Sequence, residues 1–309
     1  MTIWYYRGLT LIRNKNNHEI KSYMKVPPAL EELIHDGIID AVTRQLKSGK
    51  EASVYVVRSG GELRCAKVYK DMRQRSFKQR AQYQEGRKSR GSREQRAMGK
   101  ASSFGRKEAE EQWKNTEVDA LFQLHRAGLR VPKPFGFYSG VLIMQMLVDA
   151  TGESAPRLND VELNPELARA YHAVLIEQIK LMLCEGLIHG DLSEYNVLVD
   201  TTGPVIIDLP QIVSAAGNNN APSMLKRDVG NITMTLAAFA PELAQTHYAE
   251  EMWALFEKSE LRLDTVLTGK FKFNKKTANV AEVMEAIVDA KQVALIRAQA
   301  REVAERDED

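Results

Sequence analysis

The hydrophobic pattern of this chain changes near Asp149, and that change narrows the folds open to it. Before Asp149, short apolar runs separated by glycine-containing turns predict strands. These runs occupy residues 42–46, 52–57, 63–69, 136–138 and 141–146. After Asp149, apolar residues recur at helical spacing. A small antiparallel sheet followed by helices indicates an α+β chain with two lobes.

Further elements can be placed on the same grounds. A helix is expected to begin after Asn164, which can cap it, with Pro165 in its first turn, and to end at Gly186. Other helices are expected over residues 29–39, 107–127 (closed by Gly128) and 278–301, and a hairpin over 197–199 and 205–207. Residues 1–28 show no sustained periodicity and are expected to form an extension.

The strongest chemical signal is the run His-Gly-Asp-Leu-Ser-Glu-Tyr-Asn at residues 189–196. Phosphoryl transfer needs a carboxylate that orients the attacking hydroxyl and accepts its proton, and oxygen ligands that hold a metal on the phosphates. Asp191 and Asn196 have the spacing at which kinases supply these groups. Asp208 follows at the end of an apolar run, where a second metal ligand is needed. A capped turn with a surface Asp and Asn is the alternative, and it does not explain Asp208.

A second signal is the run Ser-Gly-Lys-Glu-Ala-Ser-Val-Tyr at residues 48–55, between two predicted strands. Such a turn can present backbone N–H groups to phosphates, although alone it also fits an ordinary hairpin. Lys67 interrupts an apolar strand, where an unpaired ammonium is costly to bury unless it extends to water. We expect Glu117 to pair with Lys67 because it shares a helix face with apolar residues, and Glu110 and Glu111 are the alternatives.

At these residues the sequence resembles the RIO family of atypical serine/threonine protein kinases. The resemblance runs from about Leu46 to Asn231, with SGKEASVY similar to the family's phosphate loop, HGDLSEYN to its catalytic loop and IIDLPQ to its metal-binding segment. The phosphate loop is closer to the first RIO subfamily and Pro210-Gln211 to the second, whose winged helix is not evident before Val42. This mixture indicates a separate, bacterial branch.

The resemblance implies a protein-kinase-like fold with three regions. These are an N-terminal extension (1–41), an N-lobe of antiparallel sheet and one helix (42–147, with a basic insert at 70–107) and a mainly helical C-lobe (148–309). About twenty residues separate Asp208 from the next predicted helix, and Pro210 stands where DFG kinases have glycine. A short activation segment without the usual peptide-binding platform is therefore expected. Asp228 is similar to the aspartate that braces the catalytic loop, with an exposed helix-start residue as the alternative.

The resemblance also implies ATP and Mg²⁺ as cofactors, with Mn²⁺ as an alternative metal. Asp191 is expected to be the catalytic base, with Lys67 and Asp208 acting on the phosphates, and Asn196 and Asp208 binding the metal. Met144 is expected at the gatekeeper position, with the backbone of Gln145 and Leu147 meeting adenine. The nucleotide contacts are assigned to Ser48, Gly49, Lys50, Glu51, Ala52, Val54, Lys67, Glu117, Met144, Gln145 and Leu147.

The charge of the chain is unevenly distributed. Residues 70–107 carry thirteen Lys or Arg against three acidic residues, although the whole chain has a formal net charge of +2. Phe77, Tyr83 and Phe104 lie among these cations and could stack on unpaired bases. RNA or a ribosomal particle is the expected partner of this segment, and a solvated loop is the alternative. We find no signal peptide and no membrane-length apolar run, so we expect a cytoplasmic protein without a membrane partner.

The leading hypothesis is a kinase that transfers the γ-phosphate of ATP to a protein hydroxyl, including its own, with an unknown protein substrate. An ATPase-type switch on ribosomal particles or RNA, working through a phosphoaspartate at Asp208, is the first alternative that the resemblance implies. A small-molecule kinase of the aminoglycoside type shares the HGDxxxxN pattern, but SGKEASVY and Pro210-Gln211 disfavour it. A pseudokinase is disfavoured because Lys67 and the metal-binding and catalytic residues are all present.

Overall fold

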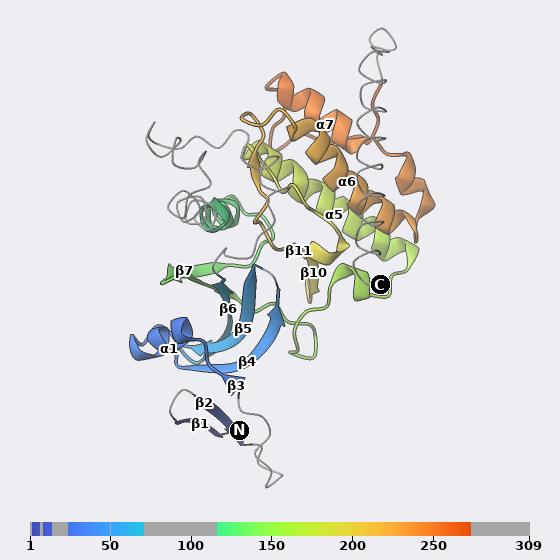
Figure 1. Ribbon diagram of the computed structural model, residues 1–309. Coiled ribbons are helices and arrows are strands. Elements are labelled where there is room, and N and C mark those ends of the chain that lie inside the picture. The colour runs from blue at the N-terminus through green and yellow to red at the C-terminus, as the bar shows by residue number, and fades with distance from the viewer. Residues whose placement is uncertain (1, 7–8, 14–23, 50, 71–115, 273–309) are drawn as a thin grey trace, which may run out of the picture. The chain divides into compact units, whose positions relative to one another are not determined.

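Residues 2–6, 9–13, 24–49, 51–70 and 116–272 are described in the computed structural model of the chain (Figure 1). The chain divides into two units, Met1–Gly269 and Lys270–Asp309. All helices and strands given below belong to the first unit. The helix expected at 278–301 and nearly all of the basic insert lie outside the described residues. No helix in the described part of the chain is both long and apolar enough to span a membrane.

The first half of the chain forms a five-stranded antiparallel sheet in the order β4-β5-β6-β8-β7. Its strands are β4 (Ala41–Ser48), β5 (Ala52–Ser59), β6 (Glu62–Tyr69), β7 (Pro134–Tyr138) and β8 (Val141–Gln145). Each contains or overlaps one of the five runs expected from the sequence. The glycine-marked turns therefore fall where the chain reverses, as at Gly60 and Gly61, which both have positive φ.

Helix α1 (Pro28–His35) packs Leu30 and Leu33 against one face of this sheet. It ends earlier than the expected residue 39, because Gly37 takes a φ of +70° and leaves the helical path. The N-terminal segment also differs from expectation. β1 (Thr2–Tyr6), β2 (Leu9–Arg13) and β3 (Met24–Lys25) form a three-stranded antiparallel sheet where no regular structure was expected. The signal for these strands is their content of β-branched and aromatic residues on either side of Arg7-Gly8, and a search for periodicity does not detect it.

The second half of the first unit is mainly helical, as expected. Helices α5 (Pro165–Cys184), α6 (Ala221–Ala237) and α7 (Tyr248–Glu257) pack against one another (Figure 1). Asn164 caps α5 by accepting a hydrogen bond from the Leu167 N–H at 2.8 Å. Three short 3₁₀ turns, η3 (Leu158–Asp160), η4 (Glu194–Asn196) and η5 (Pro241–Gln245), complete the connections. The two-lobed α+β prediction is confirmed, while its exact domain boundaries stay predictions.

Two small strand pairs flank the two polar motifs of the helical part, which are residues 189–196 and Asp208. β10 (Val197–Asp200) pairs with β11 (Gly203–Ile206) in the expected hairpin, and β9 (Leu187–Ile188) pairs with β12 (Val213–Ser214). Residues 189–196 connect β9 to β10, and Asp208 lies two residues after the end of β11. The hairpin of β10 and β11 therefore brings Asp208 close to the 189–196 loop. Helix α6 begins at Ala221, sooner after Asp208 than the twenty-residue spacing expected from the sequence.

One buried core joins the sheet to the helices. The helical segment 116–126 contributes Leu121 and Leu124, which belong to the same apolar cluster as Leu142 of β8 and Leu183 of α5. Gly128 ends this helix with a φ of +86°, as expected, while its start lies outside the described residues. The segment therefore links the sheet to the helical lobe and fixes the position of Glu117 between them.

His172 makes the stability of the helical lobe depend on pH. It is 2% exposed, its Nε2 lies 2.9 Å from Thr233 Oγ1, and burial lowers its pKa to about 4. The unfolded chain holds this proton with a pKa of about 6.5, so the folded state binds it more weakly. We expect the contribution of His172 to be complete above pH 6.5 and lost as the pH falls toward 4, a change of about 3 kcal/mol at most.

Urea unfolding of wild type and His172→Gln between pH 7.5 and 4 measures this effect. The variant should show a shallower loss of stability, although buried His189 contributes in the same direction. His35→Gln changes an exposed histidine and is the matched control, which should follow wild type. Equal slopes for wild type and His172→Gln would contradict the assignment.

Candidate active site

Lys67 forms the centre of a charge cluster that joins the sheet to the helical lobe and is buried at Glu117 but partly exposed at Asp208. Its Nζ donates to Glu117 Oε1 at 2.5 Å and to Asp208 Oδ1 at 2.8 Å. Lys67 is 8% exposed and Glu117 is 4% exposed. Burial disfavours the Lys67 ammonium, but the two carboxylates outweigh burial and raise the pKa of Lys67. Burial would raise the pKa of Asp208, but the positive charge of Lys67 keeps it below its usual range. The cluster therefore holds one cation between two anions from distant segments.

Tyr69 completes this cluster and was not identified from the sequence. Its hydroxyl donates to Glu117 Oε2 at 2.9 Å, so both carboxylate oxygens of Glu117 have a donor. Tyr69 stands two residues after Lys67 on β6, and its ring makes an edge contact with Phe137. The alternation of β6 places Lys67 and Tyr69 on one face, which is the signal that could have indicated a shared partner.

We expect Tyr69→Phe to lower the free energy of unfolding by about 1–3 kcal/mol, because it leaves a buried carboxylate oxygen without its donor. Thermal or urea unfolding measures the change. Tyr55→Phe on neighbouring β5 is the control, since no described residue hydrogen bonds to the Tyr55 hydroxyl and that loss should be smaller. Equal effects of the two substitutions would show that Tyr69 does not support Glu117.

Helix α6 holds the loop that carries Asp191. Asp228 Oδ2 accepts the Gly190 N–H at 2.7 Å, and its Oδ1 accepts the Leu192 N–H at 3.1 Å. Arg227 donates to the Gly190 carbonyl oxygen. Burial raises the pKa of Asp228 to about 7, and the side chain is 1% exposed. Asp228 is therefore a buried brace on the 189–196 loop and not an exposed residue at a helix start.

Asp191, Asn196 and Asp208 lie on connected backbone. The side-chain Nδ2 of Asn196 donates to the Asp191 carbonyl oxygen at 2.8 Å, and the Ile207 N–H donates to the Asn196 carbonyl oxygen at 2.9 Å. Asp208 takes a φ of +65°, a costly conformation for a residue other than glycine. Burial raises the pKa of Asp191. The amide orientation leaves Asn196 Oδ1 for a cation, and a carboxylate with an amide oxygen suits Mg²⁺.

The residues expected to form the phosphate loop lie in a tight turn between β4 and β5. The Gly49 N–H donates to the Ala52 carbonyl oxygen at 2.9 Å, so it is used inside the turn. Ser48 Oγ lies 3.2 Å from Ser53 Oγ. Lys70 donates from its Nζ to Ser48 Oγ at 2.9 Å and to the Gly49 carbonyl oxygen at 2.8 Å. Lys50 lies outside the described residues, and the Glu51 carbonyl oxygen accepts the Lys70 N–H at 2.9 Å.

Of the residues expected around adenine, Met144 and Gln145 end β8 and Leu147 follows it, while Val54 lies on β5. Val54 and Met144 pack against the buried Cys65 and Met146 in an apolar cluster. The Gln145 N–H donates to the Lys133 carbonyl oxygen at 2.8 Å, so this N–H is already used within the chain. The Leu147 N–H has no hydrogen bond to any part of the chain that the structure describes, while the Leu147 carbonyl accepts from Ala155. An apolar wall beside such a backbone donor suits a purine base.

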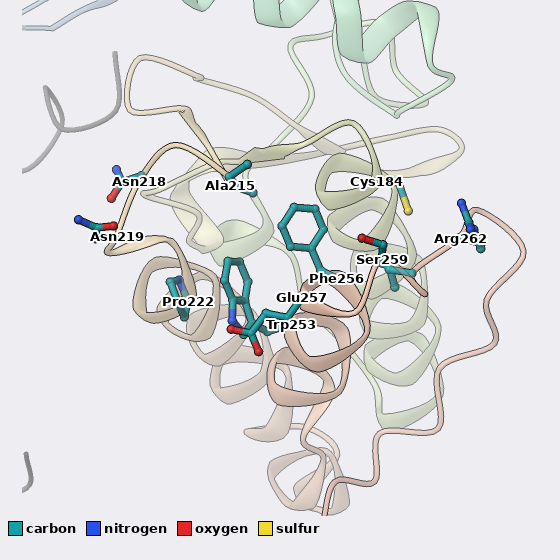
Figure 2. Close-up of a pocket in the computed structure, with 12 residues that line it drawn as sticks. Cys184, Ala215, Asn218, Asn219, Pro222, Trp253, Phe256, Glu257, Ser259 and Arg262 are labelled. Carbon is teal, nitrogen blue, oxygen red and sulfur yellow. The ribbon is translucent and has the colours of Figure 1, made fainter. Parts of the chain in front are cut away.

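A pocket of about 610 Å³ lies elsewhere in the helical lobe (Figure 2). Trp253 and Phe256 of α7 line it together with Cys184 at the end of α5 and Arg262. None of the residues expected to bind nucleotide or metal lines this pocket. It is therefore separate from the site around Lys67.

Comparison with known proteins identifies the family of this arrangement. The sequence matches the RIO domain family over residues 53–249, which includes Lys67, Glu117, Asp191 and Asp208. This chain belongs to the RIO domain family. The match begins at Ser53, so residues 48–52 of the run expected to form the phosphate loop lie outside it.

RIO proteins of both subfamilies resemble the chain to a similar degree. The RIO-type serine/threonine-protein kinase Rio1 of Haloferax volcanii is 33% identical over 208 residues, covering 66% of this chain and 66% of the relative. The RIO-type serine/threonine-protein kinase Rio2 of Methanocaldococcus jannaschii is 31% identical over 207 residues, which cover 66% of this chain and 70% of the relative. The human serine/threonine-protein kinase RIO1 is 30% identical over 205 residues, 66% of this chain but 34% of the relative. The chain thus spans just under two thirds of the Haloferax relative and about a third of the human one.

Proposed function

We propose that this RIO domain is an ATP-dependent serine/threonine protein kinase that uses Mg²⁺, with Mn²⁺ as an alternative metal. The observation that carries the proposal is the position of the Lys67 ammonium between Glu117 and Asp208. In kinases a lysine paired with a helix glutamate contacts the phosphates, and an aspartate after a short strand binds the metal. The names of the relatives support the same activity.

The residues of this chain divide the work of phosphoryl transfer. Lys67 holds the nucleotide phosphates, and Glu117 and Tyr69 fix its position. Asp191 orients the substrate hydroxyl and accepts its proton as the hydroxyl oxygen bonds to the γ-phosphorus, while the bond from that phosphorus to ADP breaks. When bound by Asp208 and Asn196, the metal ion neutralises phosphate charge. Val54, Met144 and the backbone of Gln145 and Leu147 hold the adenine.

The fate of the γ-phosphate tests this proposal. Purified protein is incubated with γ-labelled ATP with and without Mg²⁺, and label on the protein is measured beside free phosphate. A kinase that phosphorylates itself gives metal-dependent label that survives acid and neutral hydroxylamine, as phosphoserine and phosphothreonine do. Label that hydroxylamine removes indicates a phosphoaspartate and favours the switch alternative. Absence of both label and free phosphate contradicts the proposed function.

We also propose that the basic segment 70–107 binds RNA or a ribosomal particle. The support is its charge and its attachment, since Lys70 at its start contacts the phosphate loop through Ser48 and Gly49. Binding to a polyanion through many cations weakens steeply with salt. Filter binding of RNA across a salt series tests this. A variant with Gln at Arg87, Lys88, Arg90, Arg93 and Arg96 should show a flatter slope, and an unchanged slope would exclude this segment as the contact.

A further inference from the structure

Gln211 makes a contact with the Asp191 carboxylate that the kinase mechanism above does not use. Its Nε2 donates to Asp191 Oδ2 at 3.3 Å. Among the described residues it is the one side chain that donates a hydrogen bond to this carboxylate. We propose that Gln211 is a positioning residue that holds the Asp191 carboxylate in the orientation needed to receive the substrate proton. This inference rests on the proposed kinase function.

The backbone around Gln211 is held close to the loop that carries Asp191. A Cβ atom on Gly190 would lie 2.6 Å from the Gln211 carbonyl oxygen, so the two segments approach too closely for any larger residue at position 190. Gly190 has a φ of +82°, which also favours glycine. Arg227 and Asp228 bind the backbone of Gly190 from the other element packed on it. The Gln211 side chain is thus presented to Asp191 from a fixed backbone.

The other end of the Gln211 amide argues against a purely structural role. Oε1 is buried and accepts no hydrogen bond in the described part of the protein. A buried acceptor without a donor destabilises the fold, and an apolar side chain of similar shape would avoid that penalty. A glutamine at this position is therefore unfavourable for stability alone. The hydrogen bond from its Nε2 to Asp191 explains why a glutamine stands at this position.

The two roles predict opposite relations between stability and activity. If Gln211 were structural, Gln211→Met would lower the melting temperature, and any fall in activity would follow from unfolding. If Gln211 positions Asp191, Gln211→Met keeps or raises the melting temperature while kcat falls about tenfold, the size expected from one lost hydrogen bond to a charged group. The KM for ATP should stay unchanged, because the contact is with the base and not with the nucleotide.

A double-mutant cycle with Asp191→Asn tests whether Gln211 acts through Asp191. Transfer from γ-labelled ATP and melting temperature are measured for wild type, Gln211→Met, Asp191→Asn and the double variant. If the two residues act as one unit, the effects of substituting them do not add. Gln211→Met should then change the transfer rate less than about twofold in the Asp191→Asn background. Gln123→Met is the matched control, since Gln123 donates to Glu185 Oε2 at 3.1 Å away from the loop, and its kcat should stay near wild type.

The possible outcomes distinguish failure of the role of Gln211 from failure of the proposed kinase function. A tenfold loss of kcat that disappears in the Asp191→Asn background, with an unchanged melting temperature, supports positioning by Gln211. An active wild type with Gln211→Met at full kcat, an equal loss in both backgrounds, or a loss that tracks a lower melting temperature overturns the role of Gln211 alone. A wild type that turns over no ATP overturns the kinase function and the role of Gln211 with it.

Discussion

Asp191→Asn is expected to lower phosphoryl transfer by about 10²-fold or more while leaving ATP affinity nearly unchanged, the scale of a lost general base. Asparagine keeps the shape of the side chain but cannot accept the proton of the substrate hydroxyl. The brace from Asp228 and the Asn196 contact both involve the backbone of this loop, so the substitution leaves them in place. The loss should therefore appear in kcat and not in the KM for ATP.

Transfer from γ-labelled ATP and binding of a fluorescent ATP analogue, measured on the same preparations, separate the two effects. Asp264→Asn, which changes an exposed aspartate, is the matched control and should behave as wild type. If Asp191→Asn keeps turnover within a few-fold of wild type, the base must be another group.

Lys67→Met is expected to abolish measurable transfer and to lower the free energy of unfolding by about 3–5 kcal/mol. The variant leaves Glu117, which is 4% exposed, without its cation, and removing one partner of a buried ion pair carries this penalty. Asp208 also loses its hydrogen-bond donor. The same substitution removes the group proposed to hold the phosphates, so stability and nucleotide binding should fall together.

Urea unfolding and ATP binding of Lys67→Met test this expectation. Lys226→Met is the control, because Lys226 pairs with Glu250 at 3.0 Å but is 68% exposed, and an exposed pair contributes at most about 1 kcal/mol. Adding Glu117→Gln to Lys67→Met should recover part of the stability but none of the transfer. A Lys67→Met protein as stable as wild type would show that the buried pair carries no such penalty.

The strands and the main helices could be predicted because local patterns determine them. Glycine turns delimit β5 and β6, and Asn164 with Pro165 marks the start of α5 where the structure has it. The N-terminal sheet of β1, β2 and β3 was missed, although β1 and β2 are rich in β-branched and aromatic residues and the glycine-containing pair Arg7-Gly8 separates them. The early end of α1 depends on the positive φ of Gly37, which apolar spacing does not reveal.

Part of the site could be predicted from motif spacing, and the pairing of Lys67 with Glu117 from the cost of burying an unpaired ammonium. Asp191, Asn196 and Asp208 follow from their separation along the chain, and their roles remain proposals. Gln211 was named only as part of the family resemblance and Tyr69 not at all, and the contacts of both could not be found in this way, because their partners Asp191 and Glu117 lie 20 and 48 residues away and meet them only in the folded chain.

The most direct measurement of the central claim is calorimetric titration of the protein with ATP, with and without Mg²⁺, beside the Asp208→Ala variant. If Lys67, Asp208 and Asn196 form a metal–nucleotide site, wild type binds ATP more tightly with Mg²⁺, and Asp208→Ala loses most of that gain because the ion loses its carboxylate. Asp264→Ala should keep the gain. Wild-type binding that does not depend on Mg²⁺, or an equal dependence in Asp208→Ala, would contradict the assignment of this site.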